Sequence, residues 1–226
     1  MRIDILTLFP EMFAPLKESI VKRAVDANLV EINITNIRDF ALPPHYKCDD
    51  EPFGGGAGMV MMCDPIFKAI ESVKQDNSKI FYMSPRGTVF NQQIAKKITQ
   101  YQHIILLCGH YEGIDQRVID YFNIEELSIG DYVLTGGELP AMVVADCVIR
   151  LLPYVIKKES VEEESFSTNL LEYNQYTRPA VYRDMAVPEI LLNGNHAKIA
   201  EYRKQQSIEI TKKNRPDLFL RNNNFK

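Results

Sequence analysis

Three short glycine-containing turns carry the residue types that bind a cofactor through the main chain. Each follows an apolar segment: residues 84–87 read Ser-Pro-Arg-Gly, residues 108–113 read Cys-Gly-His-Tyr-Glu-Gly, and residues 128–140 hold three glycines and a proline. Glycine lets the backbone bend sharply and approach a ligand closely, whereas glycine and proline are unfavourable inside a plain strand. Three such turns after three strands predict one pocket at the strand ends of an α/β sheet.

Other cofactor and catalytic motifs are incomplete. The glycine-rich segment 54–61 has methionine at position 61, where the third glycine of a dinucleotide fingerprint belongs, and no Walker lysine follows a glycine-rich turn. His110-Tyr111-Glu112 lacks the Pro-Cys-x-x-Cys half of a zinc-deaminase signature. No Gly-x-Ser-x-Gly elbow occurs. A pocket made of backbone turns, with few charged side chains, suits a neutral or zwitterionic cofactor with a purine ring better than a polyphosphate.

Strand-like and helix-like segments alternate along residues 3–155 and must position these turns. Apolar periodicity predicts strands at 3–9, 30–37, 79–83, 103–108 and 128–134. It predicts helices at 10–24, 65–74, 91–100, 116–122 and 139–155. The first helix has Met12, Phe13, Leu16, Ile20 and Ala24 on one face, and Asp64 is the expected N-cap of the second. The alternation predicts an α/β fold with a mainly parallel sheet, covered on both faces.

The chain divides by composition into three parts. Residues 1–156 form the predicted α/β domain, within which the polar loop 38–58 is long enough to suggest a function. Residues 157–170 are acidic and polar and have the composition of a linker. Residues 171–226 are predicted to form a small α-helical domain, with helical patterns at 188–192, 195–213 and 216–220.

Composition and charge limit the location and the partners of the chain. Hydrophobic residues make up 46% and charged residues 25%, as in ordinary globular proteins. The apolar run 141–156 contains Asp146, Arg150 and Pro153, so no membrane span is predicted. The four cysteines are scattered, which predicts reduced thiols in a cytoplasmic protein.

The charge of the chain is unevenly distributed. The net charge of −4 argues against nucleic-acid binding. However, residues 196–226 hold eight Lys and Arg against three acids, and such a basic arm can bind a phosphate backbone locally. On composition alone, a solvated amphipathic helix with a charged face is the favoured alternative.

The turns, taken in order with two further motifs, resemble a known family. The further motifs are the segment 49–59, which reads Asp-Asp-Glu-Pro-Phe-Gly-Gly-Gly-Ala-Gly-Met, and Tyr-Thr-Arg-Pro at 176–179. The ordered set, extending from residue 3 to residue 218, resembles the bacterial tRNA (guanine-N1)-methyltransferase family, TrmD. This resemblance implies a homodimeric, S-adenosylmethionine-dependent enzyme with the trefoil-knotted SPOUT fold and an active site at the subunit interface. Patterning alone does not predict a knot.

The resemblance also implies a substrate and individual residue roles. The substrate is the guanosine at tRNA position 37, on the 3′ side of the anticodon, and its methylation at N1 maintains the reading frame. The residues that match the family's cofactor-binding positions are Tyr82, Met83, Ser84, Pro85, Gly109, Glu112, Ile129, Gly130, Tyr132, Leu134, Gly136, Gly137 and Pro140. Asp50, Glu172, Thr177 and Arg178 are assigned to substrate binding, and Arg150 and Glu164 to catalysis.

The chemistry of guanine agrees with the catalytic residues that the resemblance implies. N1 carries a proton that a nearby carboxylate can remove, and a fixed guanidinium stabilises the negative charge that then spreads to O6. The family has aspartate directly before Ser165-Phe166, where this chain has Glu164, with Glu163 as a fallback. The alternative for Glu164 is a place in a solvated acidic run, and the alternative for Arg150 is an ion pair with Asp146.

The remaining expectations concern the linker, the metal and competing functions. By resemblance, the linker 157–170 closes over the partner subunit's cofactor when tRNA binds, and the C-terminal helices hold the anticodon stem. Magnesium dependence is implied by the family, but no cluster of ligands in the sequence identifies a site. His110 and Arg86 stand where the family commonly has Arg and Gln. Two alternatives stay open: ribose 2′-O-methylation on the same fold, and a non-catalytic RNA-binding protein.

Overall fold

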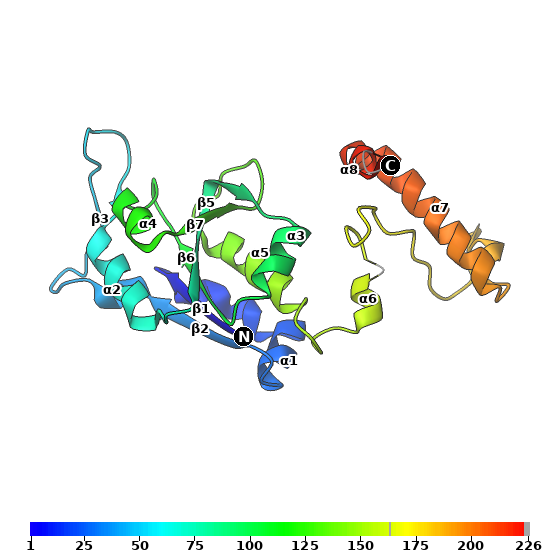
Figure 1. Ribbon diagram of the computed structural model, residues 1–226, viewed down its shortest axis with the longest axis horizontal. Helices are drawn as coiled ribbons and strands as arrows, with labels where there is room; N and C mark the ends of the chain where they lie inside the picture. The colour runs from blue at the N-terminus through cyan, green and yellow to red at the C-terminus, as the bar shows by residue number, and fades with distance from the viewer. Residues whose placement is uncertain (163, 224–226) are drawn as a thin grey trace. The chain divides into compact units, whose positions relative to one another are not determined.

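The computed structural model describes residues 1–162 and 164–223 (Figure 1). The chain divides into two compact units, one of residues 1–156 and one that begins at residue 157. Each unit is described by itself. Among the described residues, no helix is both long enough and apolar enough to cross a membrane.

Within the described residues, five parallel strands form the sheet of the first unit. These are β1 (Arg2–Thr7), β2 (Glu31–Asn36), β5 (Ser78–Val89), β6 (His103–Cys108) and β7 (Glu125–Ser128). Their order across the sheet is β2-β1-β6-β5-β7, and each neighbouring pair is parallel. The predicted α/β class with a mainly parallel sheet is therefore confirmed.

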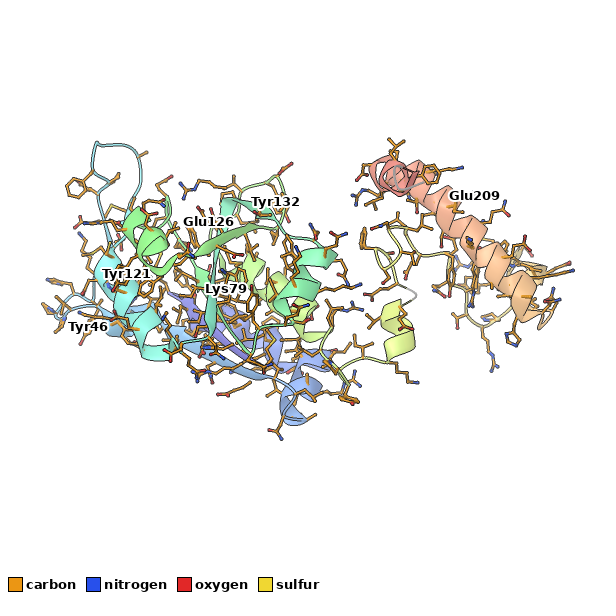
Figure 2. All side chains as sticks on the ribbon, in the orientation of Figure 1. Tyr46, Lys79, Tyr121, Glu126, Tyr132 and Glu209 are labelled. Carbon is orange, nitrogen blue, oxygen red and sulfur yellow. The ribbon has the colours of Figure 1, made fainter. Side chains whose placement is uncertain are left out.

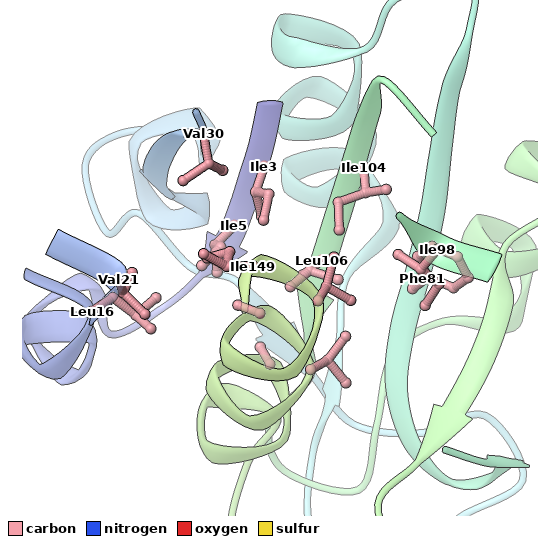
Figure 3. Packing of buried hydrophobic residues seen from close by; sticks show 14 of the residues in the cluster. Ile3, Ile5, Leu16, Val21, Val30, Phe81, Ile98, Ile104, Leu106 and Ile149 are labelled. Carbon is pink, nitrogen blue, oxygen red and sulfur yellow. The ribbon is translucent and has the colours of Figure 1, made fainter. Parts of the chain in front are cut away.

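Helices cover both faces of this sheet because successive strand residues point to opposite sides. One core contains Ile3 and Ile5 of β1 and packs against α1 (Ser19–Asp26), α3 (Gln92–Ile98) and α5 (Glu138–Ile149). Figure 3 shows this face, with Ile104 and Leu106 of β6 beside Ile149 of α5. The opposite core contains Leu6 of β1 and packs against α2 (Cys63–Val73) and α4 (Gln116–Phe122).

A buried polar network joins the amino ends of β1, β5 and β6. Asp4 and His103 are almost fully buried, and His103 Nε2 lies 2.5 Å from Asp4 Oδ2. His103 Nδ1 lies 2.7 Å from Ser78 Oγ, and Arg2 donates two hydrogen bonds to the Asp4 carboxylate, at 2.7 and 3.1 Å. Buried polar groups need such partners, so this network favours one strand register over its alternatives.

The first predicted helix is wrong in detail. The helix expected at 10–24 is broken into a 3-10 helix, η1 (Pro10–Lys17), and α1, with extended backbone at Glu18. Pro15 lies inside η1 and has no N–H to continue an α-helical ladder. Consequently Met12 is exposed, and the buried residues of α1 are Val21 and Ala24.

The expected N-cap of α2 and the expected length of α5 are also corrected. Met62, not Asp64, is the N-cap of α2, and the Asp64 carboxylate instead pairs with Lys68 Nζ at 2.7 Å. The helix expected at 139–155 ends at Ile149, and Arg150 is its C-cap.

The segments around the three turns differ from simple strand ends. β7 ends at Ser128, so the strand expected at 128–134 is wrong: Gly130 has φ +147°, and the chain leaves the sheet there. The turn at 84–87 lies inside β5, where the pairing with β7 shifts register between Met83 and Thr88. The long loop 38–58 contains the end of η2 (Ile37–Phe40), and its strand β3 (Asp49–Asp50) pairs with β4 (Val60–Met61).

The second unit is mainly helical. It contains α6 (Lys158–Glu162), η3 (Glu189–Leu191), α7 (His196–Asn214) and α8 (Pro216–Asn223), together with a hairpin of β8 (Val181–Tyr182) and β9 (Met185–Ala186) that was not expected. Leu171 N donates to Thr211 Oγ1 of α7 at 2.9 Å, which ties the segment after α6 to the long helix. Lys212 Nζ lies 4.8 Å from the Phe219 ring centroid and links α7 to α8.

Candidate functional site

A pocket of about 270 Å³ lies at the carboxyl ends of β6 and β7 and beside the register shift in the middle of β5. Three chain segments line it: residues 82–85 from β5, residues 109–113 after β6, and most of residues 127–140 after β7. Parallel strands bring their carboxyl ends to one edge of a sheet, and ligands commonly bind there. The three turns therefore meet around a single space. Figure 2 shows Tyr132 on the loop that follows β7.

All thirteen residues expected to bind the cofactor line this pocket, from Tyr82 in the first segment to Pro140 in the third. The structure thus brings them together, while their role in binding stays a prediction. Seven further lining residues were not named in advance, namely His110, Tyr111, Gly113, Leu127, Ser128, Val133 and Thr135. They lie in or next to the same three motifs, so the motifs that predict the pocket also contain most of these residues.

The second and third turns are bonded to each other by the main chain. Gly137 N donates to Gly109 O at 2.8 Å, and His110 pairs with Gly136 as an isolated antiparallel bridge. A Cβ atom added at Gly137 would lie 2.8 Å from Cys108 Cα, and one added at Gly109 would lie 2.7 Å from the Tyr82 ring. Glycine is required at Gly137 because a neighbouring main chain approaches too closely for a side chain, and at Gly109 because the buried Tyr82 ring fills that space.

The first turn and the loop 54–58 both pack against residues that line the pocket. A Cβ atom at Gly87 would collide with the main chain of Glu126 and Leu127 on β7. A Cβ atom at Gly58 would collide with the side chain of Glu112, and Glu112 N donates to Met59 O at 3.0 Å. The loop is thereby fixed to the second wall of the pocket.

The charge of the pocket favours a cation over an anion. Glu112 is its acidic lining residue, and the lining residues within the described part of the chain include no Lys or Arg. Arg86, at the first turn, donates instead to Glu126 at 3.2 Å and to Gln116 at 3.4 Å. A polyphosphate would find no basic side chain in the pocket, whereas a positively charged or zwitterionic ligand would meet a carboxylate.

Tyr82 is the most buried aromatic residue of the pocket, with 6% of its surface exposed. Burial raises the pKa of its phenol to about 12, and the negative charge of Glu126 acts in the same direction. The phenol therefore remains a neutral group throughout the physiological pH range.

We expect the raised pKa of Tyr82 to make stability fall between about pH 10 and about pH 12. In this window the unfolded chain, whose tyrosines ionise near pH 10, releases the proton before the folded chain does. The free energy of unfolding should therefore drop by up to roughly 2–3 kcal/mol more in the native chain than in Tyr82→Phe. Urea unfolding of both proteins at pH 8 and across this window measures the difference. If the free energy of unfolding changed equally with pH in both proteins, the raised pKa of Tyr82 would be contradicted.

The residues expected to act on the substrate lie outside the lining of this pocket. Arg150 ends α5, where its main-chain N–H donates to Asp146 O at 3.0 Å. Asp50 lies on β3, and its carboxylate pairs with Lys47 Nζ at 2.9 Å, which lowers the pKa of Asp50. Glu164, Glu172, Thr177 and Arg178 belong to the second unit.

The segment around Glu164 has local order of its own. Ser167 N donates to Glu164 O at 3.2 Å, and Glu172 N donates to Ser165 Oγ at 3.0 Å. Glu163, the fallback base, lies outside the described residues. Across residues 1–162 and 164–223, no group of three or more His, Cys, Asp and Glu residues is arranged to hold a metal ion.

Comparisons with known proteins point to one family. The profile of the family described as tRNA (Guanine-1)-methyltransferase TrmD matches residues 1–221. A tRNA (guanine-N(1)-)-methyltransferase of Caldanaerobacter subterraneus subsp. tengcongensis is 56% identical, over 99% of this chain and 93% of the relative. Proteins of the same name from Ruminiclostridium cellulolyticum and Clostridioides difficile are 55% and 52% identical, over 97% and 99% of this chain and 96% and 99% of the relatives.

Proposed function

The chain belongs to the tRNA (guanine-1)-methyltransferase TrmD family, and we propose that it transfers a methyl group from S-adenosylmethionine to N1 of the guanosine at tRNA position 37. The observation that carries the proposal is the single pocket formed by three glycine-containing turns. Family membership supplies the reaction class, and the pocket supplies a place for the methyl donor.

The residues of the pocket fit S-adenosylmethionine. Main-chain groups of the glycine turns can approach the adenine edge, while Ile129, Leu134 and Tyr132 offer apolar surface to the ring. Glu112 and the lack of Lys or Arg in the described lining suit the positively charged sulfonium group. When bound, the sulfonium supplies an already activated methyl group, so the protein mainly has to align donor and acceptor.

Two side chains are proposed to act on the guanine. Glu164 removes the N1 proton, because N1 is a poor nucleophile until that proton leaves. Arg150 stabilises the negative charge that develops on O6. The segment 157–170, which carries Glu164, is proposed to close over the site when tRNA binds and so to exclude water.

The second unit is proposed to bind the anticodon stem. Its long helix α7 carries Lys198, Lys204, Lys212 and Lys213, and this positive charge can neutralise phosphates. Thr177 and Arg178, with Asp50 and Glu172, are proposed to contact the tRNA. Cytoplasmic location is part of the same proposal, since the four cysteines are free thiols.

A homodimer with the SPOUT knot completes the proposal. Large apolar side chains are exposed on α5 at Leu139 and Val143, and on the neighbouring η1 at Met12. Such a patch is typical of a subunit interface. Family membership supports the knot and the placement of the active site between two subunits.

The proposal is tested by mapping the methyl group on tRNA. The purified protein is incubated with methyl-labelled S-adenosylmethionine and an unmodified tRNA transcript that has guanosine at positions 36 and 37. We expect 1-methylguanosine at position 37, and no label in a matched transcript with adenosine 37. A 2′-O-methylated product would indicate a ribose methyltransferase instead. Complete absence of label in both transcripts would contradict the proposed activity.

A further inference from the structure

A buried hydrogen bond joins two residues that lie outside the lining of the pocket, one of which contacts a lining residue. Thr7, at the end of β1, is fully buried, and Glu138, at the start of α5, is 1% exposed. Thr7 Oγ1 donates to Glu138 Oε1 at 2.8 Å and accepts from Phe9 N at 2.9 Å. A buried carboxylate is costly unless its hydrogen bonds are made, so this bond fixes where the Glu138 side chain lies.

The Glu138 carboxylate contacts the third turn of the pocket. A Cβ atom added at Gly136 would collide with Glu138 Oε2 and with His110 Cδ2, which would lie 2.8 Å away. The carboxylate and the imidazole ring therefore both contact the space where a side chain at position 136 would lie. Since Gly136 pairs with His110 and Gly137 N donates to Gly109 O, Glu138 lies where the second and third turns meet.

Residues at and just after the end of β1 contact both the Glu138 side of the third turn and His110 of the second turn. Thr7 binds Glu138, and the ring centroid of Phe9 lies 4.9 Å from that of His110. The negative charge of Glu138 also acts on this region, since it adds to burial in raising the pKa of Cys108, which ends β6. Gly136 and His110 line the pocket, and their contacts with Glu138 and Phe9 limit the positions that they can take.

We propose that Glu138 is a positioning residue for the cofactor pocket, and that its hydrogen bond from Thr7 fixes the Gly136–Gly137 turn against Gly109 and His110. A turn rich in glycine has many accessible backbone conformations. The Thr7–Glu138 bond limits this freedom, so the pocket is formed before the ligand arrives and less binding free energy is lost in ordering it. The identity of the ligand rests on the proposed function, whereas the positioning role rests on the geometry.

The decisive comparison is Thr7→Val with Thr7→Ser. Valine keeps the size of threonine but lacks the hydroxyl, whereas serine keeps the hydroxyl and lacks the methyl group. Calorimetry with S-adenosylmethionine should show a dissociation constant about 10-fold higher for Thr7→Val and within about 3-fold of the native value for Thr7→Ser. The KM for tRNA should not change, because the substrate surface is untouched. Circular dichroism confirms that each variant is folded.

Glu138→Ala and a ligand-independent measurement complete the test. Glu138→Ala should weaken binding at least as much as Thr7→Val. The double variant should weaken it by less than the product of the two single effects, because both changes remove the Thr7–Glu138 hydrogen bond. Hydrogen exchange without ligand should be faster at the Gly137 amide in Thr7→Val than in Thr7→Ser. The positioning role is overturned if exchange and affinity are native in Thr7→Val, or if exchange is faster and affinity lower to the same extent in both Thr7 variants. If the native chain fails to bind S-adenosylmethionine, the proposed function falls, and exchange alone decides the role of Glu138.

Discussion

Replacing Glu164 with glutamine should lower the rate constant of methyl transfer by a factor of about 10²–10⁴, which is the usual contribution of a general base. Glutamine has nearly the same size as glutamate but cannot accept the N1 proton of guanine. Binding should change little, because the amide keeps one hydrogen-bond acceptor. Single-turnover measurements with saturating S-adenosylmethionine and tRNA isolate the chemical step.

Two matched variants make the test of Glu164 specific. Glu162→Gln removes an acid two residues away and should keep the native rate constant. Glu164→Asp restores the residue that the family resemblance places here, retains the carboxylate and should keep most of the activity. A native rate in Glu164→Gln would show that another group takes the proton, and Glu163→Gln would then be the next variant to measure.

The fold could be predicted where local patterns and burial agree. β6 (His103–Cys108) and α4 (Gln116–Phe122) were predicted with these bounds. Every residue of β6 is buried, and its short run of apolar residues lacks the exposed polar face that an amphipathic helix would have. Helix α4 begins where the Asp115 side chain accepts from Arg117 N at 2.9 Å, a local capping signal. Such elements need little information from the rest of the chain.

Predictions failed where periodicity conflicted with backbone chemistry. The apolar spacing of residues 10–24 is helical, but Pro15 and the extended backbone at Glu18 divide the segment. The segment 128–134 is apolar enough for a strand, but Gly130 takes φ +147°. Hydrogen bonds within the turn, between Ser128 Oγ and Gly130 N and O, hold that bend. Side-chain patterns report burial and do not report such dihedral angles.

The candidate site was predictable only in its local parts. The glycine turns carry their own signal, because tight turns restrict residue type wherever they occur. Thr7 and Glu138 carry none: one looks like an ordinary strand residue and the other like the first residue of a helix. Their hydrogen bond joins positions 131 residues apart, which only the folded chain brings together. The placement of Glu164 depends on a partner subunit and on tRNA in the proposed function, so a single chain cannot specify it.

Replacing Gly137 with alanine should raise the dissociation constant for S-adenosylmethionine by about 100-fold. The added Cβ would lie 2.8 Å from Cys108 Cα and 2.9 Å from Gly109 N, both of which are backbone atoms that cannot rotate away. The third turn must then move from the second, which lengthens the 2.8 Å hydrogen bond from Gly137 N to Gly109 O. Overpacking of this kind costs about 1–3 kcal/mol. Because the strain would be relieved at the pocket, most of it should appear as lost affinity, at about 1.4 kcal/mol for each tenfold change.

Gly54→Ala provides the matched control for this prediction. Gly54 has φ +88°, so alanine is strained there as well, but no heavy atom lies within 4 Å of the added Cβ. Its cost should therefore be confined to about 1 kcal/mol of stability, with native affinity for S-adenosylmethionine. Calorimetry and thermal unfolding on both variants separate the two effects, because only Gly137→Ala forces two walls of the pocket apart. Native affinity in a folded Gly137→Ala protein would mean that the methyl donor does not depend on the contact between the second and third turns, and the pocket would then have to be assigned to another ligand.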